Sequence, residues 1–172
     1  APHLADLCCG HGLTGLVFAL MERSVQRVTL LDSSRPQAHD AVRDAVVSVG
    51  PWVAEKTTYV EGDVADAAGL LPEGTAVVGV HACGDRTDRV IDAAVELGGP
   101  VAVMPCCYRS TWRPAPPGIA DALGRETAAD IHRSYRLQGA GYRVDWDEIP
   151  PAITPKNRIL VGWRPPEWSA GG

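Results

Sequence analysis

The sequence has no long apolar run and no excess of positive charge. No run approaches the roughly 18 apolar residues that a membrane-spanning helix needs, and no charged-then-apolar signal segment opens the chain. We therefore expect a soluble, cytoplasmic protein with no membrane partner. The 16 basic and 21 acidic residues give a net charge of -5. This balance argues against a nucleic-acid surface that covers the whole domain, although it leaves room for a local basic rim.

The cysteine content does not fit a disulfide framework. There are five cysteines, an odd number, and four of them form two adjacent pairs that rarely bridge without strain. Reduced thiols are the better interpretation. With 172 residues, 45% of them hydrophobic, the chain can bury one substantial core, so residues 1–172 are expected to form a single domain.

Strand and helix patterns alternate along the chain with short connections. Helices are predicted at residues 13–23, 36–49, 87–97 and 119–137, with a short helical piece before Pro72. Strands are predicted at residues 4–7, 28–32, 57–60, 76–82, 101–104, 143–149 and 158–163. The connection between the last two strands is too short for a crossover helix, so these strands form an antiparallel pair. The sequence therefore predicts an α/β fold with a doubly wound, Rossmann-like, mostly parallel seven-stranded sheet and a terminal antiparallel hairpin.

The first predicted strand starts almost at Ala1, whereas folds of this kind normally place a helix before it. We therefore expect an N-terminal segment upstream of this sequence.

A glycine-rich turn follows the first strand. Its spacing, Gly10-x-Gly12-x-x-Gly15, allows a backbone to approach a cofactor closely. Asp6 lies inside the strand, where its carboxylate can accept hydrogen bonds from an ammonium group. This resembles the D-L-G-C-G-x-G motif of class I S-adenosylmethionine (SAM) methyltransferases, with Cys8 in place of the first glycine. The resemblance implies SAM as the cofactor, bound by Asp6, Cys8, Gly10 and Gly12.

Two further strands end in acids. Asp32 lies twenty residues after Gly12, the spacing at which a carboxylate reaches both hydroxyls of a ribose. We assign Asp32 and Ser33 to the cofactor, with a helix-capping role for Asp32 as the alternative. Asp63 and Val64 are expected to contact the adenine; for Asp63, an ordinary turn or a helix N-cap is the alternative.

All five cysteines fall at the ends of three strands that should be neighbours in the sheet. A zinc site is one interpretation of these cysteines. It is the weaker one, because no spacing is C-x-x-C and two adjacent residues rarely point at one metal, so we predict no metal site. Cys8 and Cys9 are better explained as small buried residues. For the other three, packing and lining of an acceptor pocket both stay open. The residues expected around one pocket are Cys8, Cys9, Cys83, Cys106, Cys107, His11 and His81.

Two motifs make the resemblance more specific. The segment from His81 to Asp85 (His-Ala-Cys-Gly-Asp) and that from Pro105 to Tyr108 (Pro-Cys-Cys-Tyr) follow successive strands. They resemble a methyltransferase family that includes the tRNA 2'-O-methyltransferases with a Cys-Cys-His-type motif and their bacterial relatives. Here Tyr108 stands where those proteins have histidine.

The candidate catalytic residues come from these two motifs. His81 is the candidate base, because its side chain titrates near neutrality, and it is also counted among the cofactor contacts. A histidine bonded only to backbone is the alternative. Asp85 would orient the imidazole or the acceptor, and Tyr108 would hydrogen-bond the acceptor.

A basic rim is predicted on the same side of the sheet. Arg109 and Arg113, with Lys156, Asn157 and Arg158 of the terminal hairpin, would bind a phosphate or carboxylate there. Solvated surface charge is the alternative. The predicted substrate-binding residues are Cys83, Cys106, Cys107, Arg109, Lys156 and Asn157.

The sequence thus predicts a SAM-dependent methyltransferase whose acceptor partner is RNA or a small molecule. An NAD-dependent oxidoreductase is an alternative, although Asp6 and the terminal hairpin count against it. A cofactor-binding module without activity and a cysteine-rich metal-binding regulator also stay open.

Overall fold

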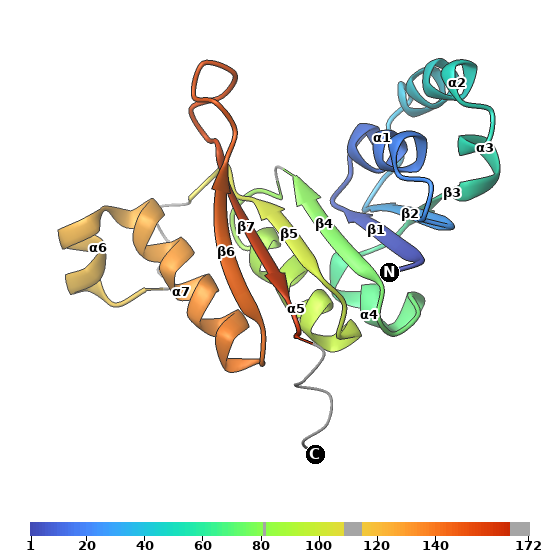
Figure 1. The fold of residues 1–172 in the computed structure, drawn as a ribbon. Coiled ribbons are helices and arrows are strands. Elements are labelled where there is room, and N and C mark those ends of the chain that lie inside the picture. Colours follow the sequence, from blue (N-terminus) through green and yellow to red (C-terminus); the bar gives the residue numbers. More distant parts are fainter. Residues whose placement is uncertain (81, 109–114, 166–172) are drawn as a thin grey trace.

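The structure, a computed structural model, describes residues 1–80, 82–108 and 115–165 of the chain. Its centre is one seven-stranded sheet with the strand order β3-β2-β1-β4-β5-β7-β6 (Figure 1). The first five strands pair in parallel, and β7 is antiparallel to both β5 and β6. The strands are β1 (His3–Leu7), β2 (Arg27–Asp32), β3 (Thr57–Glu61), β4 (Ala76–Val80), β5 (Val101–Met104), β6 (Arg143–Glu148) and β7 (Arg158–Trp163). The predicted fold class is confirmed.

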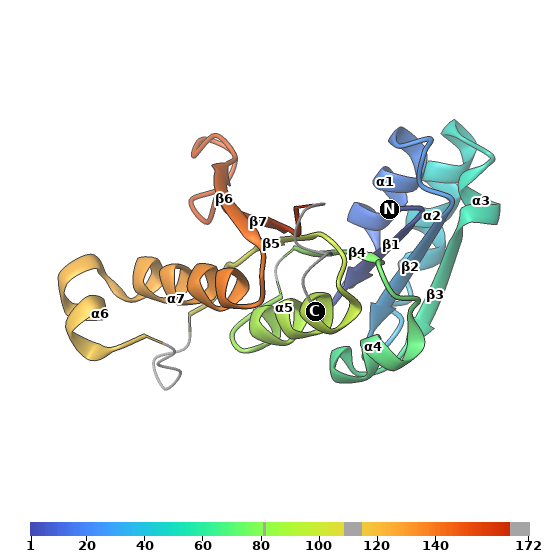
Figure 2. The ribbon, with the colours of Figure 1, turned by 60° about the horizontal axis from the view of Figure 1, so that its bottom comes forward.

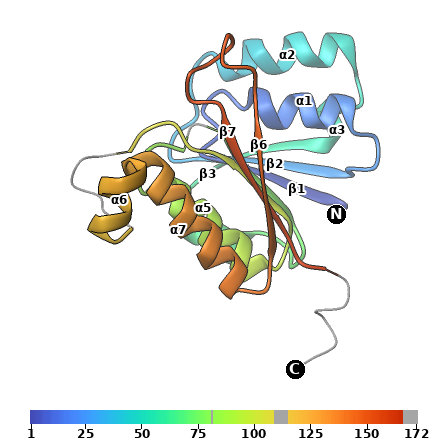
Figure 3. The same cartoon turned by 60° about the vertical axis from the view of Figure 1, so that its left-hand side comes forward.

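Helices cover both faces of the sheet (Figures 2 and 3). On one face lie α1 (Leu13–Met21), α2 (His39–Val49) and α3 (Val53–Lys56); on the other lie α4 (Ala67–Leu70), α5 (Arg86–Leu97) and α7 (Arg125–Gly139). A 3-10 turn, η1 (Val64–Asp66), precedes α4, and α6 (Pro117–Leu123) packs on α7. In the described part of the chain, no helix has the length and apolarity needed to cross a membrane.

The central strands are buried on both faces because their apolar residues run consecutively. Side chains alternate between the two faces of a strand, so Leu4 and Leu30 pack towards α1, whereas Ala5 and Leu31 pack towards α5. All four are at most 4% exposed. Two apolar cores, one on each face, therefore hold the strands whose ends form the site.

Some predicted elements differ from the structure in number or extent. The helix predicted at residues 119–137 is two helices, because Gly124 between α6 and α7 has a φ of 82°, in the left-handed region that ends a helix. The short α3 after Pro51 was not predicted. β4 ends at Val80, earlier than residue 82.

A buried ionic network attaches α7 to α5 and β7. The side chains of Arg133 and Asp130 are 0% exposed, and Arg133 Nη1 lies 2.9 Å from Asp130 Oδ1. Arg133 Nη2 lies 3.1 Å from Asp88 Oδ2, and Arg158 Nη1 lies 2.7 Å from Asp130 Oδ2. Removing one partner of such a network leaves a buried charge with less compensation, and breaking a buried ion pair costs about 3–5 kcal/mol.

Candidate active site

The glycine-rich turn leaves β1 in left-handed backbone conformations. Cys8, Gly10 and Gly12 have φ values of 58°, 54° and 77°, and α1 begins directly after Gly12. A Cβ added at Gly10 would meet no atom within 4 Å, so this stretch of backbone is open to a ligand. A Cβ at Gly15 would lie 2.4 Å from Leu30 Cδ2. Gly15 therefore serves the close packing of α1 on β2, whereas Gly10 leaves room above the backbone.

Asp6 lies beneath this turn and is 2% exposed. Its Oδ2 accepts a hydrogen bond from the backbone N–H of Gly15 at 2.9 Å. Burial raises the pKa of Asp6 to about 7; the Gly15 hydrogen bond opposes this rise, and the charge of Asp32 adds to it. A cationic group placed near Asp6 would favour the ionised carboxylate.

Asp32 joins the end of β2 to the glycine-rich turn. Its Oδ2 accepts from the backbone N–H of Gly10 at 2.7 Å, and its Oδ1 accepts from the backbone N–H of Ser33 at 2.7 Å. The N-cap of α2 is Ala38, so Asp32 does not cap that helix. A carboxylate held by two backbone donors at a strand end is well placed to accept from further hydroxyl groups.

Asp63 is the N-cap of η1, and its Oδ1 accepts from the backbone N–H of Ala65 at 2.9 Å. The structure therefore shows the capping role that the sequence left open for Asp63. The adenine contact stays a prediction.

A cavity of about 260 Å³ opens at the carboxyl ends of β1, β2 and β3. Six of the predicted site residues line it, and three of them are carboxylates that can accept hydrogen bonds from the hydroxyl groups of a ligand. The lining residues are Cys8, Leu31, Asp32, Ser33, Gly62, Asp63, Val64, Asp85, Arg86 and Arg89. A groove of about 720 Å³ lies between α7 and the β6–β7 hairpin, but none of the predicted site residues lines it.

Two arginines of this cavity were missed from the sequence. Arg89 Nη2 lies 3.4 Å from Asp85 Oδ2, and Arg89 Nη1 lies 3.6 Å from Asp63 Oδ1. Arg86 and Arg89 follow Asp85 at one and four positions in the first turn of α5. Their position just after the β4 motif was the signal that could have identified them.

Two buried or half-buried rings support the glycine-rich turn from below. The Tyr59 hydroxyl donates to the carbonyl oxygens of Gly10 at 2.8 Å and Ser34 at 3.2 Å. His39, 1% exposed, places its Nδ1 2.9 Å from the carbonyl oxygen of His11. The Tyr59 and His39 rings meet edge to face at 4.5 Å. No sequence motif identified either residue.

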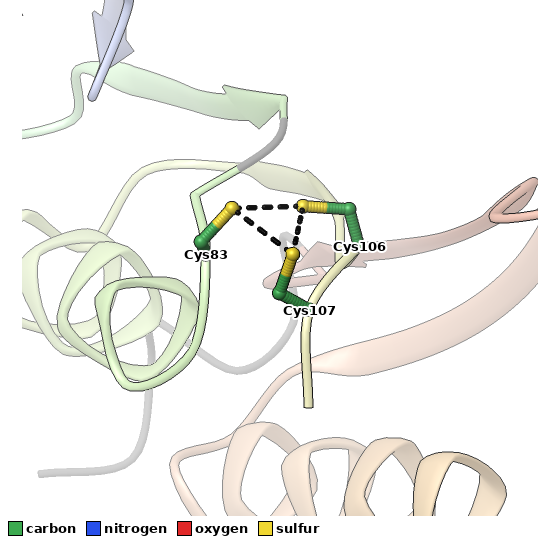
Figure 4. A group of neighbouring side chains, drawn as sticks. All are labelled: Cys83, Cys106 and Cys107. Atoms are coloured by element: carbon green, nitrogen blue, oxygen red, sulfur yellow. Dashed lines mark hydrogen bonds between the residues drawn. The ribbon is translucent and has the colours of Figure 1, made fainter. Parts of the chain in front are cut away.

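The five cysteines fall into two groups. Cys8 and Cys9 pack against the cores on opposite faces of the sheet, and burial raises the pKa values of their thiols to about 11 and about 12. The sulfurs of Cys83, Cys106 and Cys107 instead point towards one another from the loops after β4 and β5 (Figure 4). Burial and the hydrogen bonds with the other two thiols raise the pKa of Cys106 to about 12.

Tyr108 is anchored to the ionic network. Its hydroxyl donates to Asp130 Oδ2 at 2.7 Å, and burial together with this carboxylate raises the pKa of Tyr108 well above its usual range. Lys156 Nζ lies 5.9 Å from the centre of the Tyr108 ring. Asn157 Nδ2 donates to the carbonyl oxygen of Ile149 at 2.7 Å, which closes the hairpin turn. The structure thus brings Lys156, but not the Asn157 amide, towards Tyr108.

His81, Arg109 and Arg113 lie outside the described residues, so their predicted roles stay predictions.

Solved structures with a similar fold include methyltransferases. A putative rRNA-methylase from Clostridium thermocellum aligns with a TM-score of 0.63 and 13% identity over 94% of this chain and 85% of that chain. A 16S rRNA (adenine(1408)-N(1))-methyltransferase from Catenulisporales acidiphilia, solved with its cosubstrate SAM, aligns with a TM-score of 0.58 and 17% identity over 92% and 82% of the two chains. At this identity the similarity shows a shared fold.

Curated relatives match a smaller part of the chain. The glutathione S-transferase C-terminal domain-containing proteins of Homo sapiens and Mus musculus are 29% identical over 107 residues, or 61% of this chain. The chain spans about 15% of the length of these relatives.

A protein family described as a methyltransferase domain matches residues 1–112, which contain the glycine-rich turn, the cavity and the three clustered cysteines. Because this match covers more than half of the sequence, the chain belongs to that methyltransferase domain family.

Proposed function

We propose that this chain is a SAM-dependent methyltransferase whose acceptor is RNA or a small molecule. The observation that carries the proposal is the cavity at the ends of β1, β2 and β3, where Asp32 faces the cavity beside the open backbone of Gly10. Bound SAM would supply a methyl group on a sulfonium, which is transferred by in-line displacement.

The chain's own residues would hold the cofactor at three points. Asp6 and the open backbone at Gly10 would receive the amino-acid end, since a cationic ammonium offsets the cost of ionising a buried carboxyl. Asp32 would accept from both ribose hydroxyls, and Asp63 with Val64 would contact the adenine. The Tyr59 hydroxyl supports this arrangement, because its bond to Gly10 fixes the turn before any ligand binds.

The acceptor would enter beside the loops that follow β4 and β5. Little covalent help is needed for displacement from a sulfonium, so positioning supplies most of the catalysis. His81 remains the candidate base and Asp85 its orienting partner. The Tyr108 hydroxyl already donates to Asp130, so towards an acceptor its oxygen would accept a hydrogen bond.

RNA is supported as an acceptor class by the two motifs that resemble tRNA 2'-O-methyltransferases and by the rRNA methylases among the structural neighbours. The net charge of -5 favours local contacts over a broad nucleic-acid surface. Lys156 and Arg158 would supply such contacts from their places beside Glu126 and Asp130. An NAD-dependent oxidoreductase is not favoured, because β7 is antiparallel and Asp6 is buried in β1.

Calorimetry with SAM, S-adenosylhomocysteine and NAD tests the cofactor. We expect binding of the first two and none of NAD, and loss of binding in Asp32→Ala. Transfer of a labelled methyl group to unmodified tRNA, rRNA and a small-molecule panel then tests the acceptor. Binding of NAD but not SAM would overturn the proposal, and SAM binding without transfer to any acceptor would favour a non-catalytic module.

A further inference from the structure

Three cysteine sulfurs meet where β4 and β5 end (Figure 4). The Sγ of Cys83 lies 3.1 Å from that of Cys106 and 3.4 Å from that of Cys107, and the sulfurs of the two adjacent cysteines are 3.6 Å apart. A disulfide would need about 2.05 Å. Across the described residues, no other group of three or more cysteine, histidine or carboxylate side chains brings its ligand atoms this close.

These distances are near those of a three-thiolate metal site. Zinc binds sulfur at about 2.3 Å in tetrahedral geometry, which places any two sulfurs about 3.8 Å apart. To reach that spacing, the sulfur pairs at 3.1, 3.4 and 3.6 Å would need to separate by about 0.7, 0.4 and 0.2 Å. The sequence-based objection, that adjacent cysteines rarely point at one metal, does not hold because Cys106 and Cys107 both point towards Cys83.

The backbone holds the two loops together independently of the sulfurs. The N–H of Gly84 donates to the carbonyl oxygen of Cys107 at 3.0 Å, and the buried Arg133 donates through Nη2 to the carbonyl oxygen of Gly84 at 3.3 Å. A site whose ligands are already positioned costs little ordering when a cation binds. Cys107 is exposed, which gives an ion a route from solvent.

We propose that Cys83, Cys106 and Cys107 bind one zinc ion through three thiolates. Thiolates are soft ligands that favour zinc over magnesium or calcium. Binding releases one proton from each thiol, so Zn²⁺ replaces three protons. Three protein ligands leave the fourth tetrahedral position to a further donor. The zinc site goes beyond methyl transfer and does not rest on it, because zinc binding and SAM binding are measured separately.

The full chain, reduced with a phosphine under anaerobic conditions, would be equilibrated with zinc chloride and then freed of unbound metal. Elemental analysis should give one zinc per chain. Cobalt(II) in place of zinc should produce thiolate-to-cobalt charge-transfer bands and the visible bands of a tetrahedral site. Cys83→Ser and Cys107→Ser should each lower zinc affinity at least about tenfold, because each removes a direct ligand. The matched control is Cys9→Ser, which alters a cysteine that packs beneath α1 and should keep one zinc.

Substoichiometric zinc in the parent chain, or cobalt spectra without thiolate bands, would overturn the proposal. The proposal would also be overturned if Cys9→Ser lost as much zinc as the Cys83→Ser and Cys107→Ser variants, because zinc binding would then not depend specifically on the three clustered cysteines. Circular dichroism of each variant identifies misfolding. The cobalt spectrum of the unaltered chain tests the site even if a serine variant fails to fold.

Discussion

The raised pKa of Asp6 predicts that SAM binds more weakly as the pH falls below 7. In the structure, burial holds this pKa at about 7, and only the ionised carboxylate attracts an ammonium group. Roughly three quarters of the molecules carry the ionised form at about pH 7.5, but roughly one in eleven at about pH 6. The Kd for SAM should therefore rise about eightfold between these two conditions, or about 1.2 kcal/mol.

Asp6→Asn removes the titrating group. At neutral pH the Kd of this variant for SAM should be roughly ten- to a hundredfold higher than that of the parent chain, because a charge-assisted bond of about 1.5–3 kcal/mol is lost. Its Kd should also be nearly independent of pH. Calorimetry in buffers of different ionisation enthalpy would also detect the proton that Asp6 releases on binding. Glu61→Gln is the matched control, because Glu61 is an exposed carboxylate at the end of β3, and it should keep the parent's pH dependence. The reasoning is refuted if Asp6→Asn shows the same pH dependence as the parent chain.

The raised pKa of Asp6 has the opposite effect on folding stability: higher pH favours SAM binding but disfavours the ligand-free folded state. A carboxyl whose pKa rises from 3.8 to about 7 on folding holds its proton longer in the folded state, so the free energy of unfolding without ligand should fall as the pH rises from about 4 to about 7. Thermal unfolding across this range, compared with Asp6→Asn, measures the contribution.

Three further changes test the architecture of the site. Asp32→Ala should weaken SAM and S-adenosylhomocysteine binding alike by at least about tenfold in calorimetry, because the donors of both ligands lose the same carboxylate; unchanged affinity would remove Asp32 from the ribose site. Cys8→Gly should be about 1 kcal/mol more stable than Cys8→Ala in urea unfolding, because only glycine relieves the φ of 58°, and equal stabilities would contradict strain there. Asp130→Asn should lower the free energy of unfolding by about 3–5 kcal/mol, because it removes the buried carboxylate that pairs with both Arg133 and Arg158, whereas the exposed Asp145→Asn should change it by less than about 0.5 kcal/mol.

The order of strands and helices could be predicted because the spacing of apolar residues within each segment indicates its secondary structure. The β-branched and apolar run at 28–31, together with strands and helices that alternate through short connections, was enough to identify a mostly parallel sheet. The parallel strand direction then placed Asp32 and Asp63 at the same edge of that sheet. Gly124 was included in a predicted helix because its neighbours favour helix. A glycine inside a helical pattern does not by itself indicate the left-handed φ that Gly124 adopts.

The details of the site depended on contacts between distant residues. Adjacent side chains point to opposite faces only within a strand, and β5 ends at Met104, so the joint orientation of Cys106 and Cys107 could not be read from their adjacency. The anchoring of Tyr108 by Asp130 joins residues 22 positions apart. No pattern within either segment predicts that bond.

The pairing of β5 with β7 means that the family-matched segment does not end where the sheet ends. Residues 1–112 include β5 but neither β7 nor α7. Cut at that boundary, the fragment would present the backbone N–H and C=O groups of β5 as an open edge, ready to pair with another copy. Such a fragment is prone to aggregate, and a shortened version of the protein that is meant to remain monomeric should extend at least to Trp163.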